Sequence, residues 1–157
     1  MLLRHLADES VGLVGPRSDN LGSSARIEVP ADYESGLEGF ARDLQHARFG
    51  ESFDVQLLAR LAIAMRREVY AAAGPLDEGY DLSLFEDADY CERVRSAGWR
   101  VICAHDTFVH RAPAMSAQRR FDSRQYNAMW DQSRERFESL WGTWERHDDR
   151  VEPAVGG

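Results

Sequence analysis

The feature that most constrains the fold is the stretch 74–100, in which a loop leads into a helix that opens with two carboxylates. Glu86 and Asp87 fall in the expected first turn, where free backbone N–H groups and the positive end of the helix dipole favour negative charge. Asp87, Cys91 and Val94 are spaced at i, i+4 and i+7, which places Asp87 at the top of the buried stripe. A carboxylate at the border between core and solvent can accept a proton from a bound hydroxyl.

The same stretch predicts the end of this helix and the strand after it. Asp89 and Arg93 are four residues apart, so we expect them to pair on the solvent side of the helix. Gly98 suits the left-handed conformation that often comes after the last turn of a helix. The largely apolar residues 99–104 then predict a short strand.

The beginning of the chain predicts one short helix and one strand. Residues 1–7 have three leucines on one side and indicate the end of an amphipathic helix. Residues 11–16 predict a short buried strand that ends in a turn, and residues 17–23 form a polar, glycine-containing loop.

The middle of the chain predicts two helices around a strand. Residues 33–50 keep their apolar side chains at helical spacing. Residues 53–65 are mostly apolar, and their second half predicts a central strand. That strand leads into a short helix over residues 66–73, which Gly74 ends.

The end of the chain predicts another strand over residues 104–111 and a long polar helix over residues 122–150, with a break at Gly142. Residues 152–157 are expected to be frayed. The side chains predicted to form the buried stripe of the long helix are Tyr126, Met129, Trp130, Phe137, Leu140, Trp141 and Trp144.

Composition and charge narrow the class of protein. A chain of 157 residues can bury a real core in one domain. The net charge of −8 argues against nucleic acid or anionic lipid as the main partner. Cys91 and Cys103 form no Cys-x-x-Cys pair, which favours buried reduced thiols and a cytoplasmic location. No apolar run approaches the length of a membrane span, so we expect no membrane insertion.

These elements together predict an α/β fold. We expect a mixed sheet of three or four short strands flanked by helices, with the long C-terminal helix packed along it. The expected segments are a domain over residues 1–112, a helical extension over residues 113–150 and a disordered tail over residues 151–157.

Several short motifs stand in order along the chain, and together they resemble the acceptor half of family 2 inverting glycosyltransferases of the GT-A fold. Weaker matches occur in the first loop, at Gly15-Pro16, Ser18 and Gly22, and over residues 127–144. The main motifs are Arg66-Arg67-Glu68-Val69, Gly74-Pro75-Leu76-Asp77-Glu78, Phe85-Glu86-Asp87-Ala88-Asp89, Cys91 with Arg93, and Ala97-Gly98-Trp99-Arg100.

The resemblance implies a transfer of sugar, with inversion, from a nucleotide-sugar to a saccharide acceptor, of the kind used in polysaccharide biosynthesis. It implies that Asp87 is the base that deprotonates the acceptor hydroxyl and that Glu86 orients the acceptor. It also implies a divalent cofactor, Mn or Mg. The residues implied for acceptor binding are Ser18, Asn20, Arg66 and Asp89, and those implied for the donor diphosphate or its metal are His110 and Arg111.

Plainer interpretations of the same residues stay open. An acidic pair at a helix start often serves only as a cap, and Arg66 can be a solvated charge. His110 can be structural. Arg111 stands where the family has its metal histidine, so it either replaces the metal with a fixed positive charge on the leaving group or marks a decayed site. The helix dipole lowers the pKa of Asp87 and burial raises it, and the sequence leaves the balance open.

The resemblance covers nearly the whole chain but only about half of the enzyme, because the donor half with its Asp-x-Asp motif has no counterpart here. The chain is then a fragment, a subunit that pairs with a donor-half protein or with a second copy, or an inactive remnant that binds saccharide or protein. The first two interpretations predict exposed apolar surface at the N-terminal edge. The residues expected to form it are Leu2, Leu3, Leu6, Val11, Leu13 and Val14.

Overall fold

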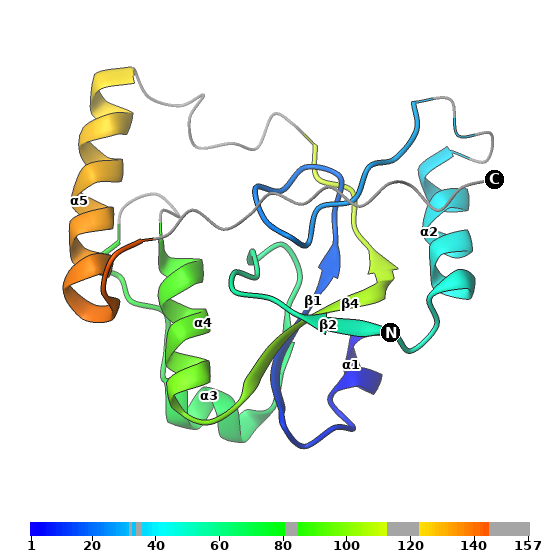
Figure 1. Ribbon diagram of the computed structural model, residues 1–157, viewed down its shortest axis with the longest axis horizontal. Helices are drawn as coiled ribbons and strands as arrows, with labels where there is room; N and C mark the ends of the chain where they lie inside the picture. The colour runs from blue at the N-terminus through cyan, green and yellow to red at the C-terminus, as the bar shows by residue number, and fades with distance from the viewer. Residues whose placement is uncertain (32, 34–35, 81–84, 113–122, 145–157) are drawn as a thin grey trace.

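The computed structural model describes residues 1–31, 33, 36–80, 85–112 and 123–144 (Figure 1). The predicted tail 151–157 lies outside these residues, as do residues 113–122 and 145–150 of the predicted helical extension. A sheet stands in the middle of the molecule, with helices on each side. In chain order the elements are α1 (Leu2–His5), β1 (Val11–Arg17), α2 (Gly36–Ala47), β2 (Ser52–Asp54), β3 (Ala64–Met65), α3 (Arg67–Ala73), α4 (Glu86–Ser96), β4 (Arg100–Phe108) and α5 (Ser123–Trp141).

The four strands form one mixed sheet in the order β2-β4-β1-β3. The central strands β1 and β4 run parallel, with Leu13 opposite Val101 and Gly15 opposite Cys103. The edge strands β2 and β3 are antiparallel to their neighbours. The predicted mixed sheet of a few short strands flanked by helices is therefore confirmed, and so is the long helix near the C-terminus.

The strand β4 is longer than predicted. Residues 99–104 and 104–111 were expected to form two strands, but residues 100–108 form one continuous strand that is buried for most of its length. The polar residues in its second half do not interrupt it, because they are satisfied. Asp106 accepts hydrogen bonds from the Gly50 N–H at 2.9 Å and from the Thr107 hydroxyl at 3.0 Å.

The prediction of a central strand in the run 53–65 was wrong. In the second half of this run, where the strand was predicted, only Ala64–Met65 joins the sheet, and it does so at the edge opposite β2. Phe53 and Asp54, in the first half, belong to the edge strand β2. Val55 still donates its backbone N–H to the Val101 carbonyl of β4 at 3.0 Å, and the side chains of Val55 and Leu58 pack into the core. The apolar character of this run therefore comes from a loop that covers the sheet.

The two faces of the sheet are covered by different helices (Figure 1). Leu13, Val101 and Cys103 pack with α3 and α4 on one face. Val14 and Ile102 pack on the other face, where α1 covers them. Both cysteines are buried and neither forms a disulfide, so the prediction of buried reduced thiols is confirmed.

The apolar surface predicted at the N-terminal edge is mostly closed. Strand β1 lies between β4 and β3, so its two edges are paired, and Val11, Leu13 and Val14 are buried. Leu3, at 73% exposure, is the exposed member of the predicted set, and the other two leucines pack partly against the sheet. The prediction was wrong because β1 is a central strand rather than an open edge.

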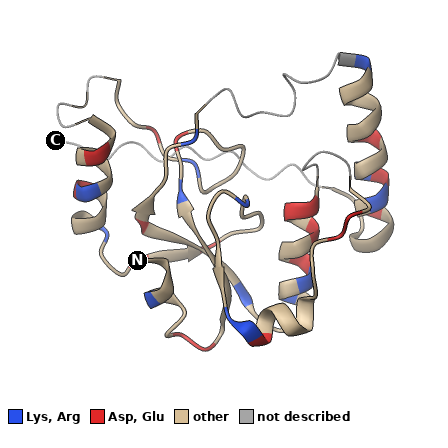
Figure 2. Cartoon of the chain, turned by 180° about the vertical axis from the view of Figure 1, so that it is seen from behind, with Lys and Arg blue, Asp and Glu red and all other residues tan. Residues whose placement is uncertain are grey.

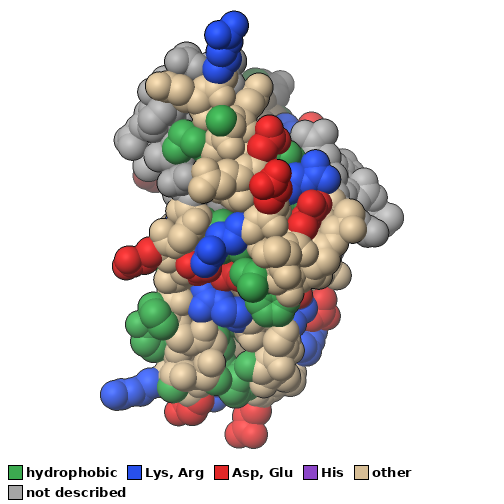
Figure 3. Space-filling model, turned by 90° about the vertical axis from the view of Figure 1, so that its left-hand side faces the viewer, with side chains coloured by type: hydrophobic (Ala, Val, Ile, Leu, Met, Phe, Trp, Pro, Cys, Tyr) green, Lys and Arg blue, Asp and Glu red, His purple; other side chains and the backbone are tan. Residues whose placement is uncertain are grey.

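Helix α5 packs beside α4 and not, as was predicted, along the sheet, because its aromatic side chains meet the start of α4. The buried side of α5 is also narrower than the sequence predicted. Phe137 is 5% exposed and belongs to a cluster with Tyr80 and Ala88. Leu140, predicted to be buried, is 54% exposed. Seen from the side of α5 and α4, the surface shows hydrophobic side chains among arginines and carboxylates (Figure 3). None of the helices in the described part of the chain has the length and apolar character that a membrane span requires.

Candidate functional site

The start of α4 is set by an unusual backbone conformation at Phe85, whose φ is +67°. This left-handed conformation is uncommon for a residue with a side chain. Three aromatic side chains surround the Phe85 ring, with centroid distances of 5.4, 5.7 and 4.9 Å: Trp130, Phe137 and Trp144. The helix therefore begins at Glu86, and its first turn is acidic while its last turn is basic (Figure 2).

The acidic pair is bound by an arginine that the sequence did not single out. The Arg60 guanidinium donates to a carboxylate oxygen of Glu86 through Nη2 and to Asp87 Oδ1 through Nε. The Arg60 backbone N–H donates to Asp87 Oδ2 at 3.2 Å. Arg60 lies in the loop between β2 and β3, so this loop holds the two carboxylates in place.

Burial decides the charge balance at Asp87. Removal from water raises the pKa of the Asp87 carboxyl above its ordinary value, although the positive charges and hydrogen bonds of Arg60 and the charge of Arg111 act in the opposite direction. The question that the sequence left open is therefore answered in favour of burial. A carboxylate with a raised pKa is a stronger base than an exposed one.

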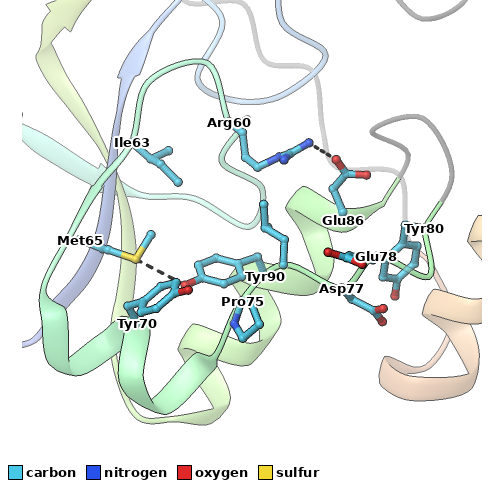
Figure 4. A pocket seen from close by; sticks show the side chains of 11 residues that line it. Arg60, Ile63, Met65, Tyr70, Pro75, Asp77, Glu78, Tyr80, Glu86 and Tyr90 are labelled. Carbon is cyan, nitrogen blue, oxygen red and sulfur yellow. Dashed lines mark hydrogen bonds and ion pairs between the residues drawn. The ribbon is translucent and has the colours of Figure 1, made fainter.

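A pocket of about 530 Å³ opens beside Glu86 (Figure 4). Arg60 and Glu86 lie at one end, and Asp77 and Tyr80 lie toward α5. Burial raises the pKa of Tyr80 to about 12, so its hydroxyl keeps its proton. The volume is within the range of small-molecule sites in proteins.

A second polar group lies where β1 and β4 end. Because these strands are parallel, their carboxyl ends meet at one edge of the sheet. Asp19 comes after β1, and its carboxylate is 2.5 Å from His110 Nδ1 and accepts the Arg111 N–H at 3.1 Å. The Asn20 side chain donates to the Arg111 carbonyl at 3.4 Å. Arg111 is also close enough to Asp87 to lower its pKa, which links this group to the acidic pair.

The structure therefore brings together most of the predicted site residues. Asn20, His110 and Arg111 form one group, although sequence reasoning missed Asp19 at its centre. The signal that could have found Asp19 is its place just after a buried strand that pairs with a second parallel strand. Ser18 is buried, and its backbone pairs with the segment around Arg26.

Two predicted acceptor-binding residues, Arg66 and Asp89, form contacts within the protein. The Arg66 guanidinium donates to the Leu6 carbonyl, at the end of α1. Asp89 was expected on the solvent side of α4, but it is buried. Asp89 accepts hydrogen bonds from Arg93 Nε at 2.9 Å and from Trp141 Nε1 at 2.8 Å. The solvent-side prediction was wrong because α5 covers this face of α4.

A protein-held metal does not fit the described residues. They contain no group of three or more histidine, cysteine or acidic side chains placed to hold an ion. At the ends of β1 and β4, Asp19 and His110 are side chains of the kind that bind metals, but they are hydrogen-bonded to each other. We therefore derive no chemical step through a metal, and the Mn or Mg cofactor stays a prediction.

The candidate site thus combines the Asp87 carboxylate, the pocket beside Glu86 and the positive charge of Arg111. Glu86 faces the pocket, Asp87 is held beside it, and Arg111 acts on Asp87 from the ends of the parallel strands. Comparison of the chain with protein-family models, with curated proteins and with solved structures found no match. The function must therefore be inferred from these residues and their geometry.

Proposed function

We propose that this chain carries the acceptor side of an inverting glycosyltransferase similar to family 2 enzymes of the GT-A fold. The observation that carries the proposal is Asp87, a largely buried carboxylate with a raised pKa at the start of α4. Its neighbour Glu86 lines a pocket large enough for an acceptor. The motifs around it, from Arg66 to Arg100, are those of the resembled family.

In the proposed reaction the acceptor hydroxyl oxygen attacks the anomeric carbon of a nucleotide-sugar. A new bond forms between that oxygen and the anomeric carbon, while the bond from this carbon to the diphosphate oxygen breaks. The acceptor proton passes to Asp87, and the nucleoside diphosphate leaves with the bonding electron pair. Attack from the side opposite to the leaving group inverts the configuration.

The contacts give the other residues roles in this proposal. Glu86 accepts a hydrogen bond from the acceptor and orients it. Arg111, with His110 near it, stabilises the negative charge that develops on the diphosphate, since guanidinium groups suit phosphate. For Asp87 to act as base, the acceptor hydroxyl must replace Arg60 Nε at Oδ1.

A second candidate is a binding function without catalysis. One observation favours it: Arg60 already neutralises Glu86 and Asp87, because its guanidinium forms an ion pair with each of the two carboxylates. In that case the pocket binds a saccharide or a protein group, and no bond changes. The buried thiols, which form no disulfide, suit a reducing compartment under either proposal, so we propose a cytoplasmic location.

The test combines donor binding with a transfer assay on the full chain. We would titrate UDP-, GDP- and dTDP-sugars by calorimetry, with and without Mn, and measure transfer to saccharide acceptors. The proposal expects transfer from at least one donor, reduced by about 10²-fold or more in Asp87→Asn. Asp131→Asn, on the exposed side of α5, is the matched control and should leave the rate unchanged.

Two outcomes would overturn the proposal. In one, Asp87→Asn transfers as fast as the wild type. In the other, the folded chain transfers from none of the three donors, which would favour the binding function. Circular dichroism of each variant shows that the comparison is made between folded proteins.

A further inference from the structure

The walls of the pocket beside Glu86 differ in chemistry from one side to the other (Figure 4). Ile63, Met65 and Tyr70 lie on the side of β3 and α3. Asp77 and Tyr80 lie on the opposite side, toward α5. A ligand that fills the whole pocket must therefore offer different groups to its two ends.

The β3 side offers little to a sugar hydroxyl. Ile63 and Met65 are partly buried against the core and carry no strong hydrogen-bonding group. The Tyr90 hydroxyl is directed at the Met65 sulfur, 3.4 Å away, which is a weak acceptor. The Tyr70 ring is 52% exposed and stands at the mouth. Apart from contacts with the two tyrosine hydroxyls, a polar ring placed here would lose water without gaining hydrogen bonds, so this side favours an apolar group.

The opposite side of the pocket carries polar side chains. Tyr80 is 6% exposed, and its hydroxyl is enclosed by protein atoms, so its ring rather than its oxygen lines the pocket. The neighbouring Asp77 carboxylate is already held by Arg136 Nη2 at 2.7 Å. The Glu86 carboxylate, which pairs with Arg60, is thus the group at this end that can accept hydrogen bonds from an incoming polyol.

We infer that the acceptor is amphiphilic, with a hydroxyl-bearing ring against Glu86 and an apolar group against Ile63, Met65 and Tyr70. The identification of this ligand as an acceptor rests on the proposed function, whereas its binding does not. The apolar group is an aryl group or an alkyl chain, since either one buries the same carbon surface. A free saccharide leaves the apolar wall uncovered.

Binding without donor tests the inference. Three glucosides that share one ring are compared by ligand-observed NMR, the methyl, phenyl and octyl β-glucosides, with the octyl compound kept below its micelle concentration. We expect the phenyl or the octyl glucoside to bind at least tenfold tighter than the methyl glucoside. The tighter of the two then identifies an aryl or an alkyl group.

Three variants locate the preference in this pocket. Ile63→Ser and Tyr70→Ser should reduce the tenfold preference to less than about threefold. Glu86→Gln should weaken the binding of all three glucosides by a similar factor and leave the preference intact. Leu37→Ser removes an apolar side chain on the exposed side of α2 and is the control for adventitious binding of the alkyl chain.

The inference is overturned if the methyl glucoside binds as tightly as the others, if none of the three binds, or if the preference survives in Ile63→Ser and Tyr70→Ser. Failure of transfer is a separate result. If the chain shows the preference but transfers no sugar, the amphiphilic site is supported and the proposed activity is overturned. If it transfers sugar without the preference, the activity is supported and the inferred acceptor class is overturned.

Discussion

At the residue scale, the pairing of Arg60 with Asp87 controls how strong a base the carboxylate can be. Burial raises the pKa of Asp87, and the guanidinium of Arg60 limits the increase through its charge and its hydrogen bonds. The arginine thus keeps the buried carboxylate ionised but also occupies the oxygen that must accept a proton. Replacing Arg60 separates these two effects.

The variant Arg60→Gln should raise the pKa of Asp87 further. The substitution removes the positive charge and keeps the backbone N–H donor, so the charged form of the carboxyl loses its main stabilising contact. Asp87 then becomes ionised at a higher pH than in the wild type, where its pKa already exceeds the ordinary value of about 3.9. The measurement is a pH titration of the aspartate carboxyl carbons by NMR.

The matched control for this titration is Arg134→Gln, which removes an arginine paired with Glu138 on α5. It should leave the titration of Asp87 unchanged. If Asp87 titrates at the same pH in Arg60→Gln as in the wild type, the ion pair does not control this carboxyl. In a transfer assay, the acidic limb of the pH–rate profile should move to higher pH in Arg60→Gln.

The sequence predicted Glu86 and Asp87 at the helix start because capping and dipole effects act within one turn. It could not predict Arg60, which is 27 residues from Asp87 along the chain and meets it only because the loop after β2 folds over α4. The position of Asp89 also depended on a distant element, since Trp141 covers it.

At the scale of elements, β1 approaches its neighbours closely because it carries glycines. A Cβ at Gly12 would lie 2.5 Å from Trp99 Cβ, and Trp99 Cβ cannot swing away as the end of a flexible side chain does. Strand β1 can therefore lie against the start of β4 only with glycine at this position.

The variant Gly12→Ala should lower the free energy of unfolding by about 1–3 kcal/mol, the usual cost of overpacking a core. Gly22→Ala is the control, because a Cβ there meets nothing within 4 Å. Urea denaturation of the two variants measures the difference. Equal stability of Gly12→Ala and Gly22→Ala would mean that β1 and Trp99 separate without cost.

A second element-scale prediction concerns Asp106, which fixes β4 to α1 and to the turn before β2. Burial alone raises the pKa of Asp106, but the hydrogen bonds from the Gly50 N–H, from His5 and from the Thr107 hydroxyl lower it by more, and the net pKa is below the ordinary value. A lowered pKa in the folded state stabilises the fold above the unfolded pKa, and the contribution disappears as the pH falls through the folded pKa.

Asp106→Asn should therefore be less stable than the wild type by about 2–3 kcal/mol at pH 7, because a charged acceptor of buried hydrogen bonds is lost. The difference should begin to decrease near pH 4, where the Asp106 carboxyl of the unfolded chain takes up a proton, and it should continue to decrease as the pH falls through the lower pKa of the folded state. Urea unfolding at pH 7, 5, 4 and 3 measures it. A difference that stays constant with pH would contradict the assigned charge of Asp106.

The helices were predicted more accurately than the strands, for a physical reason. α3 and α4 carry their start and stop signals locally, and Gly74 and Gly98 have the positive φ expected at their ends. Strand pairing depends on partners far along the chain. Polar residues in β4 are stable only because of contacts from Gly50 and α1, and the apolar run 53–65 gave no sign that it would cover the sheet.

At the scale of the whole molecule, α5 joins the rest of the protein through a small aromatic cluster. Phe137 packs against Phe85, and the Phe137 and Trp144 rings are 5.1 Å apart at their centroids. Trp141 adds the hydrogen bond to Asp89. The aromatic spacing in the sequence predicted this packing in outline. It could not predict that Phe137 is buried and Leu140 exposed, because that depends on which side of α5 faces α4.

The variant Phe137→Ala should detach α5 from α4 while the sheet stays folded. Removal of a buried phenylalanine typically costs about 3–5 kcal/mol. Phe137 belongs to the cluster that joins α5 to Tyr80 and Ala88, and it is not part of the core cluster that packs against the sheet. Hydrogen exchange measured by mass spectrometry should then show faster exchange in residues 123–141 and in the first turn of α4, with the amides of β1 and β4 still protected.

Leu140→Ala, on the exposed side of the same helix, should exchange like the wild type. Uniformly faster exchange in Phe137→Ala, including the central strands, would instead mean that α5 and the sheet unfold as one cooperative unit, and that the acidic pair depends on α5 for more than the position of Phe85.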